Sequence, residues 1–226
     1  MGKEGRCLGL IGGLGPAATV YYYRGLIAAH AAAGYTGRML IAQADVDRAR
    51  PMAEANDLDG LARYLNGFIE QLAAGGADMT AIVAITPYIC APQLVKLSRL
   101  PLIDMVSEVD IAVRARGWKR VALFGTKSTV GSKMFGRLSV DVVMPKADEI
   151  ERIHNAYLDV VYDRNTPQTL DALRELAHTL MKRDGAEAVL LAGTDLSTVM
   201  SEANAGFPTL DCAGVHIAAI TKRLTA

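Results

Sequence analysis

Two patterns of apolar residues run along the chain. Short continuous apolar runs are typical of parallel strands that are covered on both faces. Between them, apolar residues three or four positions apart indicate amphipathic helices, most clearly at Leu61, Leu65, Ile69 and Leu72. We therefore predict strands at 7–11, 39–44, 79–85, 101–105, 120–125, 140–144, 188–192 and 208–211. We predict helices at 17–32, 58–75, 87–97, 132–138, 150–162, 167–183 and 213–224.

The second half of this order repeats the first. Three segments recur at nearly constant offsets: 76–78 with 185–187, 8–12 with 121–125, and 101–104 with 208–211. Strands that alternate with helices favour parallel sheets with helices on both faces. We predict two similar α/β domains, the first formed by 1–104 plus 209–226 and the second by 105–208. A ligand cleft is expected between them, because small ligands commonly bind between domains.

Composition and charge narrow the class of protein. The 226 residues include 24 Lys and Arg and 24 Asp and Glu, so the formal net charge is zero. This balance argues against nucleic acid or an anionic membrane as a partner, and no apolar run approaches the ~20 residues that span a bilayer. The chain shows no signal-peptide pattern, and three scattered cysteines fit a reducing compartment. We expect a cytoplasmic protein without a metal site.

Ligands of parallel α/β sheets bind beyond the carboxyl ends of the strands, which directs attention to the strand-end loops. Gly12 and Gly13 can offer backbone N–H groups to a carboxylate, or they can simply form a tight turn. Arg48 can hold a carboxylate with two hydrogen bonds, with Arg50 as its rival and an exposed surface arginine as the alternative.

Hydroxyl groups also gather at the predicted strand ends. They can donate hydrogen bonds to a carboxylate without the cost of burying a charge, but the same residue types cap helices. We expect substrate contacts from four threonines, with helix N-capping as the alternative for each of them: Thr86, Thr126, Thr129 and Thr194.

The strand-end motifs resemble those of the aspartate/glutamate racemase family, in its aspartate-racemase-like branch. The resemblance rests on Ile11-Gly12-Gly13-Leu14-Gly15-Pro16-Ala17-Ala18-Thr19, on Leu123-Phe124-Gly125-Thr126-Lys127-Ser128-Thr129, and on Thr194-Asp195. It covers almost the whole chain and implies two α/β domains related by a pseudo-twofold axis, a homodimer, a small amino-acid or carboxylate ligand, and no cofactor. In the family, two cysteines act on opposite faces of the substrate Cα, one as base and one as acid.

This chain departs from the family at both cysteine positions. The first family motif reads Pro-Cys-Asn-Thr-Ala-His, and the matching stretch has Ala84 in place of the cysteine and Tyr88 in place of the histidine. The second reads Gly-Cys-Thr-Glu, and Gly193 stands in place of its cysteine. Neither Ala84 nor Gly193 can carry a proton, so the two-cysteine mechanism is not available here.

Three residues are candidates for replacing the thiols. Tyr88 can act as an acid or pack as an aromatic with a wet tip. Asp195 can act as a base or orient a partner, or it can cap the next helix. Cys212 follows a strand end, whereas Cys90 is expected to be an inert buried thiol and His216 a satisfied helix histidine.

Two classes of function follow from this combination. The first is an enzyme that acts on a small amino acid or related carboxylic acid by racemisation, isomerisation, decarboxylation or elimination, without the paired thiols. The second is a protein that binds a small acid and does not convert it. The apolar Ala84 and Ile85 further predict a ligand larger or less polar than aspartate.

Overall fold

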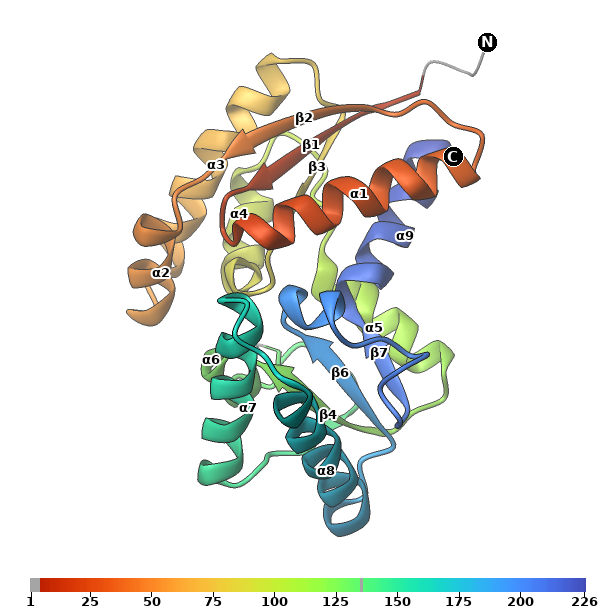
Figure 1. Ribbon diagram of the computed structural model, residues 1–226. Helices are drawn as coiled ribbons and strands as arrows, with labels where there is room; N and C mark the ends of the chain where they lie inside the picture. The colour runs from red at the N-terminus through yellow and green to blue at the C-terminus, as the bar shows by residue number, and fades with distance from the viewer. Residues whose placement is uncertain (1–4, 135) are drawn as a thin grey trace. The chain divides into compact units, whose positions relative to one another are not determined.

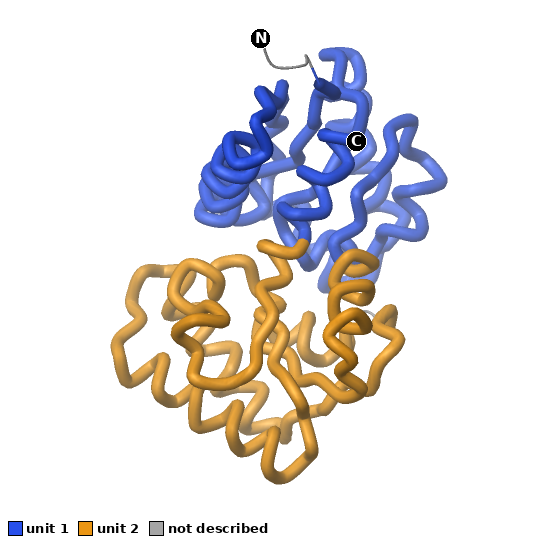
Figure 2. Tube along the Cα trace, turned by 90° about the vertical axis from the view of Figure 1, so that its right-hand side faces the viewer, with its two compact units in different colours: residues 1–105, 216–226 blue, residues 106–215 orange. Residues whose placement is uncertain are grey.

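The computed structural model describes residues 5–134 and 136–226, which divide into two compact units (Figure 2). Unit 1 comprises Met1–Met105 and His216–Ala226, and unit 2 comprises Val106–Val215. The strands are β1 (Cys7–Gly12), β2 (Arg38–Gln43), β3 (Met79–Ile82), β4 (Arg120–Gly125), β5 (Asp141–Val142), β6 (Ala188–Ala192) and β7 (Thr209–Asp211) (Figure 1). The α-helices are α1 (Pro16–Ala32), α2 (Val46–Glu54), α3 (Leu58–Ala74), α4 (Ala91–Leu97), α5 (Met105–Ala115), α6 (Lys127–Gly131), α7 (Ala147–Val161), α8 (Pro167–Asp184) and α9 (Cys212–Thr225). Two 3₁₀ helices, η1 (Thr86–Cys90) and η2 (Thr194–Thr198), follow β3 and β6.

Unit 1 is built on a parallel sheet with the order β2-β1-β3. The central strand β1 is buried along its whole length, which accounts for its continuous apolar sequence. The strand predicted at 101–105 is reduced to a single parallel bridge between Thr80 and Leu102. The Thr80 N–H donates to Pro101 O at 2.9 Å, and the segment then turns into α5 at Met105.

Unit 2 contains a parallel sheet with the order β5-β4-β6-β7. Its first three strands follow the same order as those of unit 1, and β7 takes the position of the Leu102 bridge. The prediction of two similar parallel α/β sheets is therefore confirmed. The two units divide the chain at other residues than the predicted domains: β7 pairs with β6 and unit 2 extends to Val215, whereas 209–226 was expected in the first domain.

The helix predicted at 132–138 is not formed by the described residues of that range, 132–134 and 136–138. The structure instead places the short helix α6 directly after β4, because the Thr126 hydroxyl accepts a hydrogen bond from the Thr129 N–H and so caps it. Lys133 and Met134 both adopt φ of 52°, a left-handed conformation that does not continue a helix. Among the described residues, no helix is long and apolar enough to cross a membrane.

A buried polar network holds the carboxyl-terminal helix in unit 1. His216 is fully buried, with Nδ1 2.9 Å from the Tyr22 hydroxyl and Nε2 2.8 Å from Ile103 O. Because a carbonyl only accepts, Nε2 carries the proton and Nδ1 accepts from Tyr22. Burial lowers the pKa of His216 to about 4, so the ring is neutral at pH 7. This is the satisfied histidine expected from the sequence.

Unit 2 has a buried ion pair at the start of α7. Glu149 accepts two hydrogen bonds from the Arg183 guanidinium, at 2.6 and 2.9 Å, and a third from the Lys146 N–H at 2.8 Å. These contacts lower the pKa of Glu149 to about 2.

Unit 2 also contains Trp118, the one tryptophan of the sequence, whose ring centre lies 5.4 Å from the Arg116 guanidinium carbon.

Candidate functional site

Ala84 and Gly193 occupy equivalent places in their respective sheets. Val83 extends the ladder of β3 by donating its N–H to Ile11 O at 3.1 Å, and Ala84 follows it. Ala192 is the last residue of β6, and Gly193 follows it. Each position then leads into a 3₁₀ helix that begins with a threonine. The sheet registers thus support the sequence repeat at the two positions that the family resemblance assigns to cysteines.

The loop after β3 is apolar and closely packed. Ala84 is 8% exposed and Ile85 is 5% exposed. Thr86 is half-buried, and its hydroxyl forms no hydrogen bond within the described part of the chain. Thr86 therefore remains available to donate to a ligand.

Tyr88 is buried completely, and its hydroxyl is held by the main chain. The hydroxyl accepts from the Ile82 N–H at 3.0 Å and lies 3.0 Å from Ile103 O. Its ring also packs edge-on against His216. These contacts support the packing alternative for Tyr88 over a role as an acid or base.

The geometry of the turn after β1 accounts for the glycines that it contains. Gly13 adopts φ of 78°, and a Cβ there would lie 2.2 Å from Ala44 O. Its N–H donates to the Thr19 hydroxyl at 3.1 Å. Gly12 accepts a hydrogen bond from the Ala44 N–H. The tight turn expected as the alternative is therefore present, and the Gly13 N–H already has a partner.

Arg48 lies one turn into α2, directly after β2. Its guanidinium carbon is 4.9 Å from the centre of the Tyr64 ring, and the Tyr64 hydroxyl accepts from the Asp45 N–H at 2.8 Å. The rival Arg50 is paired with Asp47 at 2.8 Å. Arg48 is exposed and stacks beside an aromatic ring, which is compatible with binding an anion from solvent.

Thr126 and Thr129 form a local hydroxyl cluster at the end of β4. Their Oγ1 atoms are 2.9 Å apart, and Thr126 Oγ1 also lies 2.9 Å from Ser128 Oγ. Thr129 is fully buried, whereas Thr126 is partly exposed. The capping alternative accounts for both residues, so Thr126 is the member of the pair that can also reach a ligand.

Four residues meet in or beside the loop after β6: Gly193, Thr194, Asp195 and Tyr157. Thr194 is 6% exposed, and its hydroxyl has no hydrogen-bond partner among residues 5–134 and 136–226. Asp195 is 7% exposed and accepts a hydrogen bond of 2.8 Å from the Tyr157 hydroxyl. A Cβ placed on Gly193 would lie 2.5 Å from Tyr157 Cε2. Tyr157 of α7, which the sequence did not single out, therefore packs against this loop.

The cysteines do not have the character of reactive thiols. Cys212 is 2% exposed, and burial together with Asp211 raises its pKa. Cys90 donates to Pro87 O at 3.2 Å, and burial raises its pKa to about 12. A thiol with a raised pKa is not ionised at neutral pH, so neither has the properties of a proton-accepting thiolate. In the described part of the chain, no group of three His, Cys, Asp or Glu side chains is placed to hold a metal ion.

The sequence model of the Asp/Glu/Hydantoin racemase family matches residues 11–220. This chain therefore belongs to that family, in agreement with the fold and with the strand-end motifs. The expectation of an aspartate/glutamate racemase fold is confirmed.

Solved structures of related fold agree. A candidate Asp/Glu racemase from Yersinia pestis matches 98% of this chain and 100% of its own, at 19% identity and a TM-score of 0.85. An aspartate racemase homologue from Pyrococcus horikoshii matches 98% and 100%, at 21% identity and a TM-score of 0.84. An arylmalonate decarboxylase matches 97% and 92%, at 14% identity and a TM-score of 0.55. The same fold thus carries more than one reaction.

Proposed function

We propose that this protein is a cofactor-independent enzyme that acts at the Cα of a small amino acid or a related carboxylic acid, without paired thiols. The observation that carries the proposal is the retention of anion-binding groups at strand ends whose cysteine positions are vacant. Thr86 and Thr194 have hydroxyls without a hydrogen-bond partner among the described residues, and the Arg48 guanidinium packs beside the Tyr64 ring. A chain that had lost all use for a carboxylate ligand would have no need of them.

A second candidate function is binding of a small acid without turnover. Ala84 and the two protonated thiols favour it, because binding needs the anion donors but no acid or base. The three free, buried thiols also support a reducing compartment such as the cytoplasm as the place of action.

One experiment separates the two candidates. The purified protein is incubated in D₂O with acidic, aromatic and hydroxy acids, including malonates, and NMR follows deuterium at Cα and product formation. Turnover or exchange of one acid supports the enzyme. A rise in melting temperature with an acid that is never converted supports the binding protein. The apolar loop at Ala84 and Ile85 leads us to expect a less polar acid than aspartate.

We predict that Arg48→Ala weakens carboxylate binding about 10- to 100-fold, because charge-assisted hydrogen bonds contribute about 1.5–3 kcal/mol. The readout is the KM of the converted acid, or its Kd by calorimetry. Arg50→Ala is the matched control, since its guanidinium is already paired with Asp47. Equal effects of the two substitutions would remove Arg48 as the anion anchor.

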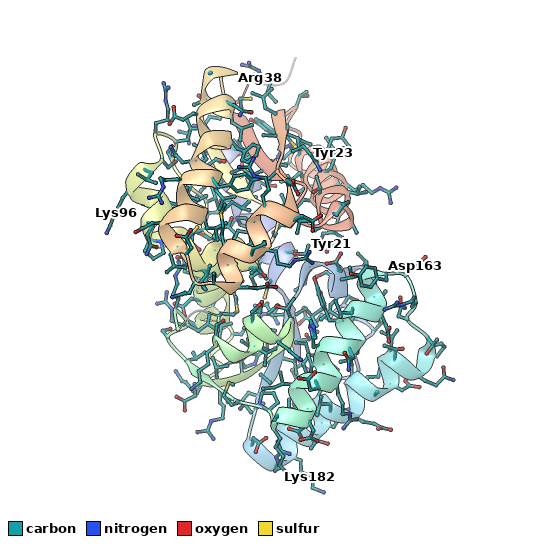
Figure 3. All side chains as sticks on the ribbon, turned by 90° about the vertical axis from the view of Figure 1, so that its left-hand side faces the viewer. Tyr21, Tyr23, Arg38, Lys96, Asp163 and Lys182 are labelled. Carbon is teal, nitrogen blue, oxygen red and sulfur yellow. The ribbon has the colours of Figure 1, made fainter. Side chains whose placement is uncertain are left out.

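We also propose a homodimer formed through the outer face of α1. Val20, Tyr23 and Ile27 share one face of this helix and are 51%, 47% and 46% exposed; Tyr23 is marked in Figure 3. Such an apolar stripe is typical of an interface. We predict that Val20→Lys combined with Ile27→Lys converts a dimer to a monomer in sedimentation, whereas Ile111→Lys, at a residue 51% exposed in unit 2, does not. A monomeric wild-type protein would contradict the proposal.

A further inference from the structure

The space beside Gly193 is filled by the ring of Tyr157. Gly193 has φ of −146° and ψ of 115°, an extended conformation that any residue can adopt. A Cβ built there would nevertheless lie 2.5 Å from Tyr157 Cε2 and 2.9 Å from Cδ2. Backbone geometry therefore does not require the glycine at 193. The aromatic ring that projects from α7 does, because it occupies the place of a side chain at that position.

The hydroxyl of this ring is held by an acid of the same loop. Tyr157 donates to Asp195 Oδ2 at 2.8 Å, and Asp195 lies in η2, directly beyond Gly193 and Thr194. Burial, followed by the charge and hydrogen bond of Asp195, raises the pKa of Tyr157 well above its ordinary value. The phenol therefore stays protonated at neutral and mildly alkaline pH. The ring of a proton-bearing residue thus fills the space beside the position where the family resemblance places a thiol.

The loop after β3 in unit 1 has no acidic side chain of its own in the place that Asp195 takes after β6. Within residues 83–90 the titratable side chains are Tyr88 and Cys90. The Tyr88 hydroxyl is held by main-chain groups of Ile82 and Ile103, and the Cys90 thiol is directed to Pro87 O. The two loops therefore differ: the loop after β6 supplies a carboxylate that binds the phenol of α7, and the loop after β3 presents Ala84.

This difference decides which reactions the residues can support. Racemisation needs a base that removes the Cα proton and an acid that returns one to the other face. Decarboxylation needs no base, because breaking the C–C bond itself leaves the electron pair on Cα. A single proton donor is sufficient for it.

We propose that Tyr157 is the proton donor of this protein, in place of the second thiol, and that its substrate is a 2-substituted malonate. The proposal rests on the function proposed above and names its acid and its substrate class. One carboxylate leaves as CO₂, and the electron pair of the broken C–C bond forms an enolate with the remaining carboxylate. The O–H bond of Tyr157 then breaks, its proton bonds to Cα, and the phenolate takes a proton from water.

Asp195 is a positioning residue in this scheme. It holds the phenolic oxygen of Tyr157 through the 2.8 Å hydrogen bond. The negative charge of Asp195 destabilises a phenolate on Tyr157. The phenol is therefore rapidly reprotonated after it has donated its proton. Replacing Asp195 with asparagine removes that charge and so lowers the pKa of Tyr157.

The test uses the full-length protein with phenylmalonate, methylmalonate and aminomalonate in D₂O, and NMR follows loss of CO₂ and deuterium at Cα. We expect conversion of one malonate to a product of a single configuration. Tyr157→Phe keeps the ring and removes only the hydroxyl, so we expect kcat to fall about 100-fold or more with little change in KM. Tyr162→Phe, in the 60% exposed residue that follows α7, is the matched control and should keep full activity.

The pH profile separates a proton donor from a merely structural tyrosine. We expect the alkaline limit of kcat to move to lower pH in Asp195→Asn, and circular dichroism to show all variants folded. An active wild type with an equally active Tyr157→Phe overturns the donor and leaves the proposed function intact. Exchange at the Cα of amino acids without loss of CO₂ from any malonate overturns the substrate class. A wild type inert toward every acid overturns the proposed function, and the donor with it.

Discussion

Replacing His216 with alanine is expected to lower the free energy of unfolding by about 3 kcal/mol at pH 7. The substitution deprives the Tyr22 hydroxyl and Ile103 O of a partner and opens a cavity at a fully buried site. Urea unfolding followed by circular dichroism measures the change. His178→Ala is the matched control, because His178 is exposed and should change stability by less than about 1 kcal/mol.

The same histidine gives the wild-type protein a specific acid sensitivity. The folded pKa of His216 is about 4, below the unfolded value of about 6.5, so the unfolded chain binds more protons between these values. Stability is therefore complete above pH 6.5 and declines by about 3 kcal/mol as the pH falls to 4. We expect this decline to be absent from His216→Ala. A variant that retained it would show that another group is responsible.

Glu149→Ala is the second substitution with a large expected effect, a loss of about 3 kcal/mol. It leaves the half-buried Arg183 without its bidentate carboxylate and removes the acceptor of the Lys146 N–H at the start of α7. Thermal unfolding measures the loss. Glu151→Ala is the control on the same helix, since its side chain is 52% exposed and its ion pair with Lys127 lies at the surface.

Glu149 also acts in a different pH range from His216. Its pKa falls from an ordinary 4.5 to about 2 in the folded state. The stability that it contributes is present above pH 4.5 and is lost as the pH falls toward 2. An acid titration of Glu149→Ala should therefore lack the stability change below pH 4.5 and keep the change between 6.5 and 4. The opposite pattern would contradict the assignment.

The strands β1, β4 and β6 could be predicted because each is a largely apolar run that ends at or next to a glycine. The repeated Gly-Ala-acid segments further indicated two copies of one unit, and both sheets are parallel as predicted. Helix α5 carried a signal that the prediction missed, since Val106, Val109 and Val113 recur at helical spacing and are all fully buried. Helix α2 was obscured by Pro51, which lies inside it.

The sequence could predict only those residues of the candidate site that directly follow a strand along the chain. Strand-end residues such as Thr194 and Asp195 were placed correctly in their loop because they directly follow β6. Tyr157 was not identified, although it lies within a helix that was predicted. Helical periodicity gives no indication that one aromatic ring reaches a glycine of another strand, because that contact depends on how α7 packs against η2. The sequence signal for this contact was Gly193 itself. A glycine directly after an apolar strand suggests that a large neighbouring side chain leaves no room for a Cβ.

The fluorescence of Trp118 reports on one of the two units in solution. Trp118 is the only indole in the sequence and belongs to unit 2, so tryptophan emission reports on that unit, whereas far-ultraviolet ellipticity sums the helices of both. Coincident fluorescence and ellipticity transitions would mean that the two units melt as a single cooperative block. Separate transitions would assign each midpoint to its own unit without any added dye. In that case the Glu149 substitution should shift the midpoint of the fluorescence transition, and the His216 substitution should leave that midpoint unchanged.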